Sequence, residues 1–101
     1  MSDPTFEFHP EAFMEAWEAR RWYTERNPQT AAAFLAELDH AQGRVPGHPD
    51  RWPAYLHETR RYRFWRFPYL LVYHATLDRI AVLAVAQTKW RPGYWKARQP
   101  K

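Results

Sequence analysis

Cationic and aromatic side chains are concentrated at the end of the chain. The segment TKWRPGYWKAR, from Thr88 to Arg98, holds four Lys or Arg residues, two Trp and one Tyr, and it holds no acid. Cations attract phosphates and carboxylates, and aromatic faces stack on bases or on other flat groups. The segment therefore favours contact with a polyanion or with an acidic partner. The alternative is that Tyr94 and Trp95 fold back and cover the core of a small domain.

The charge of the chain is divided unevenly along its length. Residues 1–59 carry five Arg against ten acids, a net charge of −5, whereas residues 60–101 carry ten Lys or Arg against Asp78 alone, a net charge of +9. A basic half of this kind indicates a polyanion or an acidic protein as partner. The division is also compatible with charge complementarity between two halves of one fold, and both interpretations stay open at this point.

Composition excludes or disfavours several classes of chemistry. The 101 residues include no Cys, which removes disulfides, thiolate metal sites and a Cys nucleophile. The five His show no metal-ligand spacing, the one Ser is Ser2, and three Gly provide no phosphate-binding loop. We therefore expect no metal and no cofactor. The N-terminus lacks the pattern of a signal peptide and no apolar run is long enough to cross a bilayer, so we expect a cytoplasmic protein that does not bind membranes.

The elements that position these side chains begin with a short strand and two helices. Residues 5–9 alternate between apolar and polar types, as in a strand. Pro10 suits the first position of a helix, and Asn27 with Pro28 ends this helix and starts a second one. Apolar residues recur at helical spacing in both segments, and the second helix ends before Pro46. With almost no loop between them, the two helices are expected to form a hairpin.

The C-terminal half changes to the pattern of strands. A loop over 47–61 precedes three predicted strands over 62–67, 68–75 and 80–87. The last of these, IAVLAVAQ, is apolar on both faces, which is typical of a central strand covered on both sides. The order β-α-α-β-β-β predicts an α+β fold in which the helical hairpin packs on a mostly antiparallel, twisted sheet.

Two motifs stand out in the C-terminal half: Phe67-Pro68-Tyr69 with Val72-Tyr73, and the closing Arg91-Pro92-Gly93-Tyr94-Trp95. Together with the helical hairpin and the apolar last strand, these motifs resemble the RelE/ParE superfamily of toxins from type II toxin–antitoxin systems, which includes plasmid stabilisation proteins. The resemblance covers nearly the whole chain. We therefore expect a single toxin-like domain over residues 1–101, with a flexible tail from about residue 96 to residue 101.

The resemblance implies a small bacterial toxin that is neutralised by a cognate acidic antitoxin. RelE-like members enter the ribosome and cut mRNA, whereas ParE-like members inhibit DNA gyrase by binding, and a fold alone does not choose between these activities. We favour a ParE-like toxin that binds and inhibits a target such as gyrase and is not an enzyme. The alternatives are a RelE-like, ribosome-dependent and metal-independent endoribonuclease, and a toxin-like domain that has lost its activity. A homodimer and a toxin–antitoxin hetero-oligomer are both compatible with the resemblance.

A ribonuclease would need particular chemistry from this chain. Attack by the 2′-hydroxyl of RNA needs a group that takes a proton, cations on the phosphorane and a proton donor for the leaving oxygen. The candidate catalytic residues are four cations and one tyrosine: Arg63, Arg66, Lys89, Arg91 and Tyr94. Many members of the family have His where this chain has Gln87, and the Gln amide cannot exchange a proton at a useful pKa. This difference favours the binding hypothesis, but some RNA-cutting relatives use only Lys, Arg and Tyr.

The same region supplies a candidate surface for the target or the antitoxin, formed by Arg60, Arg61, Trp90, Arg91, Tyr94 and Trp95. An antitoxin of this kind is expected to be largely disordered and acidic, with an amphipathic helix that wraps the toxin. Its acids would pair with the cations, and exposed Trp90 and Trp95 would provide contact area. Tyr69 and Tyr73, in contrast, are expected in the core.

Overall fold

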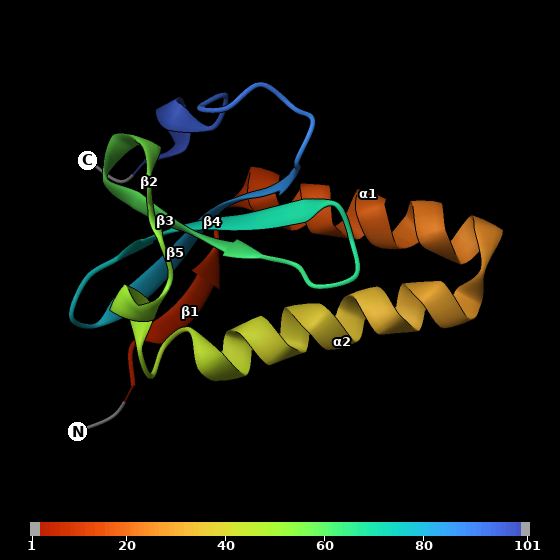
Figure 1. Ribbon diagram of the computed structural model, residues 1–101, viewed down its shortest axis with the longest axis horizontal. Helices are drawn as coiled ribbons and strands as arrows, with labels where there is room; N and C mark the ends of the chain where they lie inside the picture. Colours follow the sequence, from red (N-terminus) through yellow and green to blue (C-terminus); the bar gives the residue numbers. More distant parts are fainter. Residues whose placement is uncertain (1–2, 100–101) are drawn as a thin grey trace.

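The computed structural model describes residues 3–99 and shows two antiparallel helices packed on one face of an open sheet (Figure 1). The helices are α1 (Pro10–Arg26) and α2 (Pro28–Arg44), and the strands are β1 (Thr5–Phe8), β2 (Ala54–Tyr55), β3 (Thr59–Arg63), β4 (Tyr69–Ala75) and β5 (Arg79–Gln87). Short 3-10 helices span Pro49–Arg51, Leu56–Glu58 and Lys96–Arg98. The predicted α+β class and the helical hairpin on a mostly antiparallel sheet are confirmed.

Both helices begin where the sequence predicts, at a capping residue followed by proline. The His9 Nδ1 atom accepts a hydrogen bond from the Glu11 backbone N–H at 3.1 Å, and the Asn27 Oδ1 atom accepts one from the Gln29 N–H at 3.0 Å. Asn27 also donates its own N–H to the Tyr23 carbonyl, so one residue ends α1 and begins α2. These bonds satisfy backbone groups that a helix end leaves without a partner, and they fix the tight reversal of the hairpin.

The sheet is built around β5. Its strand order is β1-β5-β4-β3-β2, with β1 parallel to β5 and every other neighbouring pair antiparallel. β5 is buried along almost its whole length, which confirms the prediction of a central strand that is covered on both faces. β1 pairs with β5 only as far as Phe8, opposite Val82. Residues 83–87 therefore have no strand on the β1 side, and other groups must satisfy that edge.

The predicted strand boundaries in the middle of the chain are wrong. The loop predicted over 47–61 contains β2 and the first residues of β3, and the strand predicted over 62–67 turns away after Arg63. The Phe64 N–H donates to the Tyr69 carbonyl at 3.0 Å and closes the turn, while Pro68 has no N–H to offer to a strand ladder. Strand alternation stops in this turn because tertiary contacts draw both of its Phe side chains into the core.

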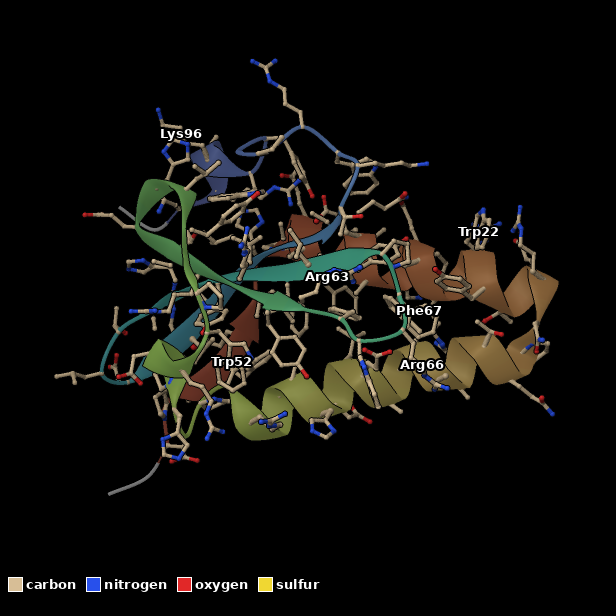
Figure 2. The ribbon with its side chains drawn as sticks, in the orientation of Figure 1. Trp22, Trp52, Arg63, Arg66, Phe67 and Lys96 are labelled. Carbon is tan, nitrogen blue, oxygen red and sulfur yellow. The ribbon has the colours of Figure 1, made fainter. Side chains whose placement is uncertain are left out.

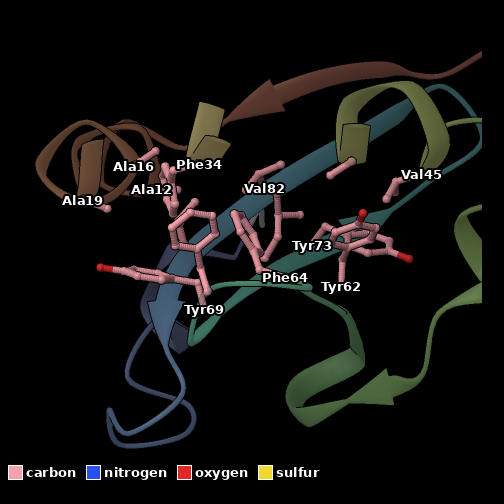
Figure 3. Packing of buried hydrophobic residues seen from close by; sticks show 14 of the residues in the cluster. Ala12, Ala16, Ala19, Phe34, Val45, Tyr62, Phe64, Tyr69, Tyr73 and Val82 are labelled. Atoms are coloured by element: carbon pink, nitrogen blue, oxygen red, sulfur yellow. The ribbon is translucent and has the colours of Figure 1, made fainter. Parts of the chain in front are cut away.

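The main core lies between the helices and the sheet (Figure 3). α1 contributes the small residues Ala12, Ala16 and Ala19. α2 contributes Phe34, which is fully buried and touches four aromatic rings at centroid distances of 5.3 to 5.6 Å: Tyr23, Phe64, Phe67 and Tyr69. Because small side chains on α1 let that helix approach the sheet closely, the large ring of Phe34 fills the space between α2 and the sheet.

A second, smaller core covers the opposite face of the sheet. A register shift between Val72 and Tyr73 of β4 leaves an extra residue in β5, so that Leu83 and Ala84 both belong to this second core. Trp95 packs against it from the C-terminal segment, which we define as residues 88–99. Figure 1 shows this segment, in blue, on the side of the sheet away from α2. Of the tail predicted to be flexible, Lys96–Arg98 form a 3-10 helix, and residues 100–101 lie outside the described residues.

We expect Phe34→Ala to lower the free energy of unfolding by about 3–5 kcal/mol, because it removes the ring at the centre of the aromatic cluster. Leu35→Ala is the matched control, since Leu35 is next in α2 but 36% exposed, and its loss should stay below about 1 kcal/mol. Urea unfolding followed by circular dichroism measures both changes. Equal losses in the two variants would contradict the central position of Phe34.

Candidate functional site

Trp95 is part of the core and not of an exposed surface, so the prediction of an exposed Trp95 is wrong. Its side chain is 1% exposed and packs against Tyr55 and His57 at centroid distances of 6.0 and 5.8 Å. The reversal that brings it there passes through Gly93, whose φ of 86° lies in the left-handed region that favours glycine. The alternative stated from the sequence, in which the terminal aromatics fold back on the core, holds for Trp95. Burial of an indole of this size outweighs the desolvation of its one N–H group.

An ion pair between Glu15 and Arg98 completes the edge of β5 where β1 ends. The Glu15 Oε1 atom accepts the Val85 backbone N–H at 3.0 Å, and the Arg98 Nη1 atom donates to the Leu83 carbonyl at 3.0 Å. The two side chains also bind each other at 3.0 Å and are only 12% and 13% exposed. They thus take the hydrogen-bonding role of a neighbouring strand. Arg98 makes a further bridge to Glu11 at 3.0 Å, so an acidic helix and the basic C-terminus are joined directly.

Tyr94 is held by the same pair. Its hydroxyl donates to Glu15 Oε2 at 2.7 Å, and the Arg98 guanidinium lies over its ring at 5.1 Å. Burial and, second, the hydrogen bond to the Glu15 carboxylate raise the pKa of Tyr94 far above its ordinary value, because both disfavour the phenolate. Tyr94 is therefore a neutral phenol at physiological pH, and its proton is engaged by Glu15.

The predicted cations on and after β3 have different surroundings. Arg63 donates to the carbonyls of Phe64, at 2.6 Å, and of Phe67, so its guanidinium holds the turn after β3. The Arg66 side chain is exposed, and Figure 2 shows it beside α2, far from Lys96 of the C-terminal 3-10 helix. Arg60 donates to the Trp52 carbonyl at 2.7 Å. These contacts give Arg60 and Arg63 structural roles that could not be predicted from the sequence.

The structure separates the candidate catalytic residues among different cavities. Lys89 lines a cavity of about 380 Å³ beside α1, together with Gln87 and Trp90. Arg63 lines a groove of about 640 Å³. Arg91 and Tyr94 line a very small cavity of about 10 Å³. Arg66 lines none of these three. The five residues therefore do not line one common cavity, although the small cavity of Arg91 and Tyr94 adjoins the other two.

Part of the predicted binding surface does remain accessible. Arg61 is exposed, lies over the Tyr55 ring at 5.1 Å and lines the same groove of about 640 Å³ as Arg63. Arg91 is exposed and Trp90 is partly exposed, and Lys89, a candidate catalytic residue that was not part of the predicted binding surface, is also exposed. These four residues, Arg61, Lys89, Trp90 and Arg91, form what we call the basic face. It is smaller than the surface predicted from the sequence, because Trp95, Tyr94 and Arg60 are used within the fold.

Sequence reasoning missed Glu15 and Arg98, which organise this region. Glu15 is one acid among several on a predicted helix, and Arg98 is one base in a predicted tail.

Within residues 3–99, no group of three or more His, Asp or Glu side chains is placed to hold a metal ion. Over the same part of the chain, no helix combines the length and the apolar character needed to cross a membrane.

Comparison with known structures identifies the fold. A chain of the chromosomal ParDE toxin–antitoxin system from P. aeruginosa matches with a TM-score of 0.71 and 11% sequence identity, over 83% of this chain and 95% of that chain. At this identity the match shows a shared fold. A search among proteins of curated function finds no significant match.

Comparison with protein families goes further. The family described as the ParE toxin of the type II toxin–antitoxin system parDE matches residues 6–90. This range includes both helices, β2 to β5, and β1 from its second residue onward. The chain therefore belongs to the ParE toxin family, and the resemblance noted from its sequence is confirmed.

We expect Arg98→Ala to lower the free energy of unfolding by about 3 kcal/mol, because it leaves the buried Glu15 carboxylate and the Leu83 carbonyl without their donor. Lys96→Ala is the control from the same 3-10 helix, where the side chain is exposed, and its effect should stay within about 0.5 kcal/mol. Urea unfolding measures both. An Arg98→Ala variant as stable as wild type would show that the pair does not hold the segment.

Alkaline pH should destabilise the fold, and Tyr94 should contribute to the effect. Burial raises the pKa of Tyr69 and of Tyr73 to about 12, and the pKa of Tyr94 is also raised, so the folded state holds these protons more tightly than the unfolded state. Their stabilisation is complete below pH 10 and is lost as the pH rises from 10 toward 12, by about 1.4 kcal/mol per pH unit for each phenol. Tyr94→Phe should make the free energy of unfolding fall less steeply with pH, because one phenol no longer contributes to the slope. Urea unfolding between pH 9 and 12 tests this, and parallel curves for wild type and variant would contradict it.

Proposed function

We propose that this toxin acts by binding and inhibiting a cellular target such as DNA gyrase, and that a cognate antitoxin neutralises it. Membership of the ParE family supports a toxin. The observation that carries the mechanism is the state of Tyr94: the candidate proton donor of a nuclease is hydrogen-bonded to Glu15 at 2.7 Å, with its pKa raised. A phenol held in this way supports the sheet edge and is poorly placed to give its proton to a leaving oxygen.

The distribution of the cations supports the same proposal. A nuclease site needs several cations and a proton donor around one phosphate, whereas inhibition by binding needs only a complementary surface. The basic face of Arg61, Lys89, Trp90 and Arg91 offers positive charge next to aromatic rings. An acidic region of a target protein would be complementary to it.

The second candidate function, a ribosome-dependent endoribonuclease, has one observation in its favour. Arg61 and Arg63 line one groove of about 640 Å³ together with Tyr55 and Thr88. Two guanidinium groups and an aromatic ring are suitable for an RNA backbone and a base. Gln87 lies in the neighbouring cavity beside Lys89 and offers no general base there.

Brief induction of the chain in bacteria distinguishes these functions. We expect growth arrest without mRNA cuts that are phased to codons, inhibition of DNA supercoiling by purified gyrase, and relief of both by the protein encoded beside the toxin. Tyr94→Phe should retain both effects, because it keeps the ring and removes only the hydroxyl. Mapping of mRNA 5′ ends measures the cuts, and circular dichroism checks the fold of the variant.

Codon-phased cuts that fall by orders of magnitude in Tyr94→Phe would overturn the proposal and establish the endoribonuclease. Growth arrest with neither cuts nor gyrase inhibition would exclude gyrase and leave another bound target. Absence of growth arrest would indicate a toxin-like domain that has lost its activity.

A further inference from the structure

Trp65 is the most exposed aromatic side chain among the described residues that the functional site does not use. It lies in the turn between β3 and β4, and it is 90% exposed. A tryptophan offers a large contact area with few rotatable bonds, and such residues are enriched among those that dominate binding energy at protein interfaces. An indole that the fold leaves in water is therefore a candidate anchor for a binding partner.

The turn that carries Trp65 is fixed from two sides. The Glu37 carboxylate of α2 accepts hydrogen bonds from the backbone N–H groups of Trp65, at 2.6 Å, and of Arg66, at 3.1 Å. From the other side, Arg63 donates to the carbonyls of Phe64 and Phe67, whose rings are buried in the core. The indole is thus held on a rigid support, which reduces the conformational entropy that binding would cost.

A cleft of about 550 Å³ opens beside Trp65, between α2 and β3. Its walls include Tyr62 and Trp52, and the Arg44 guanidinium lies over the Trp52 ring at 5.6 Å. Arg44, Arg63 and His40 bring positive or protonatable groups to the lining. The acid in the lining is Glu37, and both of its oxygens already accept backbone N–H groups of the turn. The cleft therefore combines aromatic walls with two guanidinium groups against one carboxylate, a net positive charge.

We propose that this cleft docks an acidic segment of the antitoxin, with Trp65 packed against an apolar side chain of that segment. This inference rests on the proposed function, because it names where the antitoxin of that proposal binds. Charge complementarity is the argument for this occupant. A carboxylate of the antitoxin segment would pair with the Arg44 guanidinium, and an apolar side chain of the same segment would cover the Trp65 indole. A second copy of this chain fits less well, because two chains of net charge +4 repel each other.

RNA also fits the cleft less well than a peptide. Binding of single-stranded RNA relies on several bases that stack on successive aromatic faces. Here Arg44 lies over Trp52, and Tyr62 is 9% exposed, so Trp65 offers the accessible ring. One indole beside a cationic cleft suits a single anchoring side chain flanked by acids.

Titration calorimetry with the purified protein encoded beside the toxin tests the inference. Trp65→Ala should weaken the Kd at least about 30-fold, the effect of a dominant interface residue. Leu77→Ala is the matched control, because Leu77 is 99% exposed at the tip of the β4–β5 hairpin and does not line the cleft beside Trp65. Its Kd should stay within about twofold of wild type. Since both side chains are in water, neither variant should change the melting temperature by more than a few degrees.

A charge reversal tests the electrostatic part separately. Arg44→Glu should weaken binding and reduce its dependence on salt, whereas Arg79→Glu, at the exposed start of β5, should change affinity much less. If wild type binds and both Trp65→Ala and Arg44→Glu bind equally well, the docking site is wrong while the proposed function stands. If wild type does not bind the neighbouring protein at all, the antitoxin of the proposed function is wrong and this inference falls with it. Loss of oligouridylate binding in Trp65→Ala with unchanged antitoxin affinity would instead assign the cleft to RNA.

Discussion

The ion pair between Glu15 and Arg98 is the interaction on which the C-terminal half of this structure depends. β5 is the central strand, but β1 accompanies it only as far as Val82. Without other partners, the Leu83 carbonyl and the Val85 N–H would be buried and unsatisfied, which costs several kcal/mol. One carboxylate from α1 and one guanidinium from the C-terminal segment satisfy both groups and neutralise each other. The same contact orients Tyr94 and keeps Trp95 on the second face of the sheet.

This arrangement changes the meaning of the uneven charge along the chain. Some of the basic residues after residue 59 have contacts within the fold: Arg98 pairs with two acids of α1, Arg63 holds a turn, and Arg60 binds a carbonyl. Charge complementarity between the halves therefore explains one part of the pattern. Other basic residues of this half, such as Arg61 and Arg91 on the basic face, are available for partners, and so is Arg44 of the first half, in the cleft beside Trp65.

Much of the fold could be predicted from the sequence because its determinants are local. Asn27 with Pro28 marks the reversal of the hairpin, and the apolar run of β5 marks a strand that is covered on both faces. The site could not be predicted in the same way, because Arg98 and Glu15 are 83 positions apart in the sequence. No local sequence pattern around either residue indicates that the two side chains are in contact. The two-residue β2 is too short for periodicity, and it exists through its pairing with β3. Trp65 falls within the strand predicted over 62–67, and only the turn after Arg63 shows that its side chain points into water while Phe64 and Phe67 are buried.

The geometry also relates the two surfaces that a toxin needs, one for its target and one for its antitoxin. Arg63 and Trp52 line both the cleft beside Trp65 and the groove that contains Arg61. The two spaces thus meet at β3, on the two sides of one strand, and β2 covers only part of its outer edge. A segment anchored at Trp65 would have to pass only this short edge to reach the groove of Arg61. An antitoxin docked in the cleft would then hinder access to part of the basic face sterically, and it would not need to displace Trp95 or break the Glu15–Arg98 pair that holds the fold.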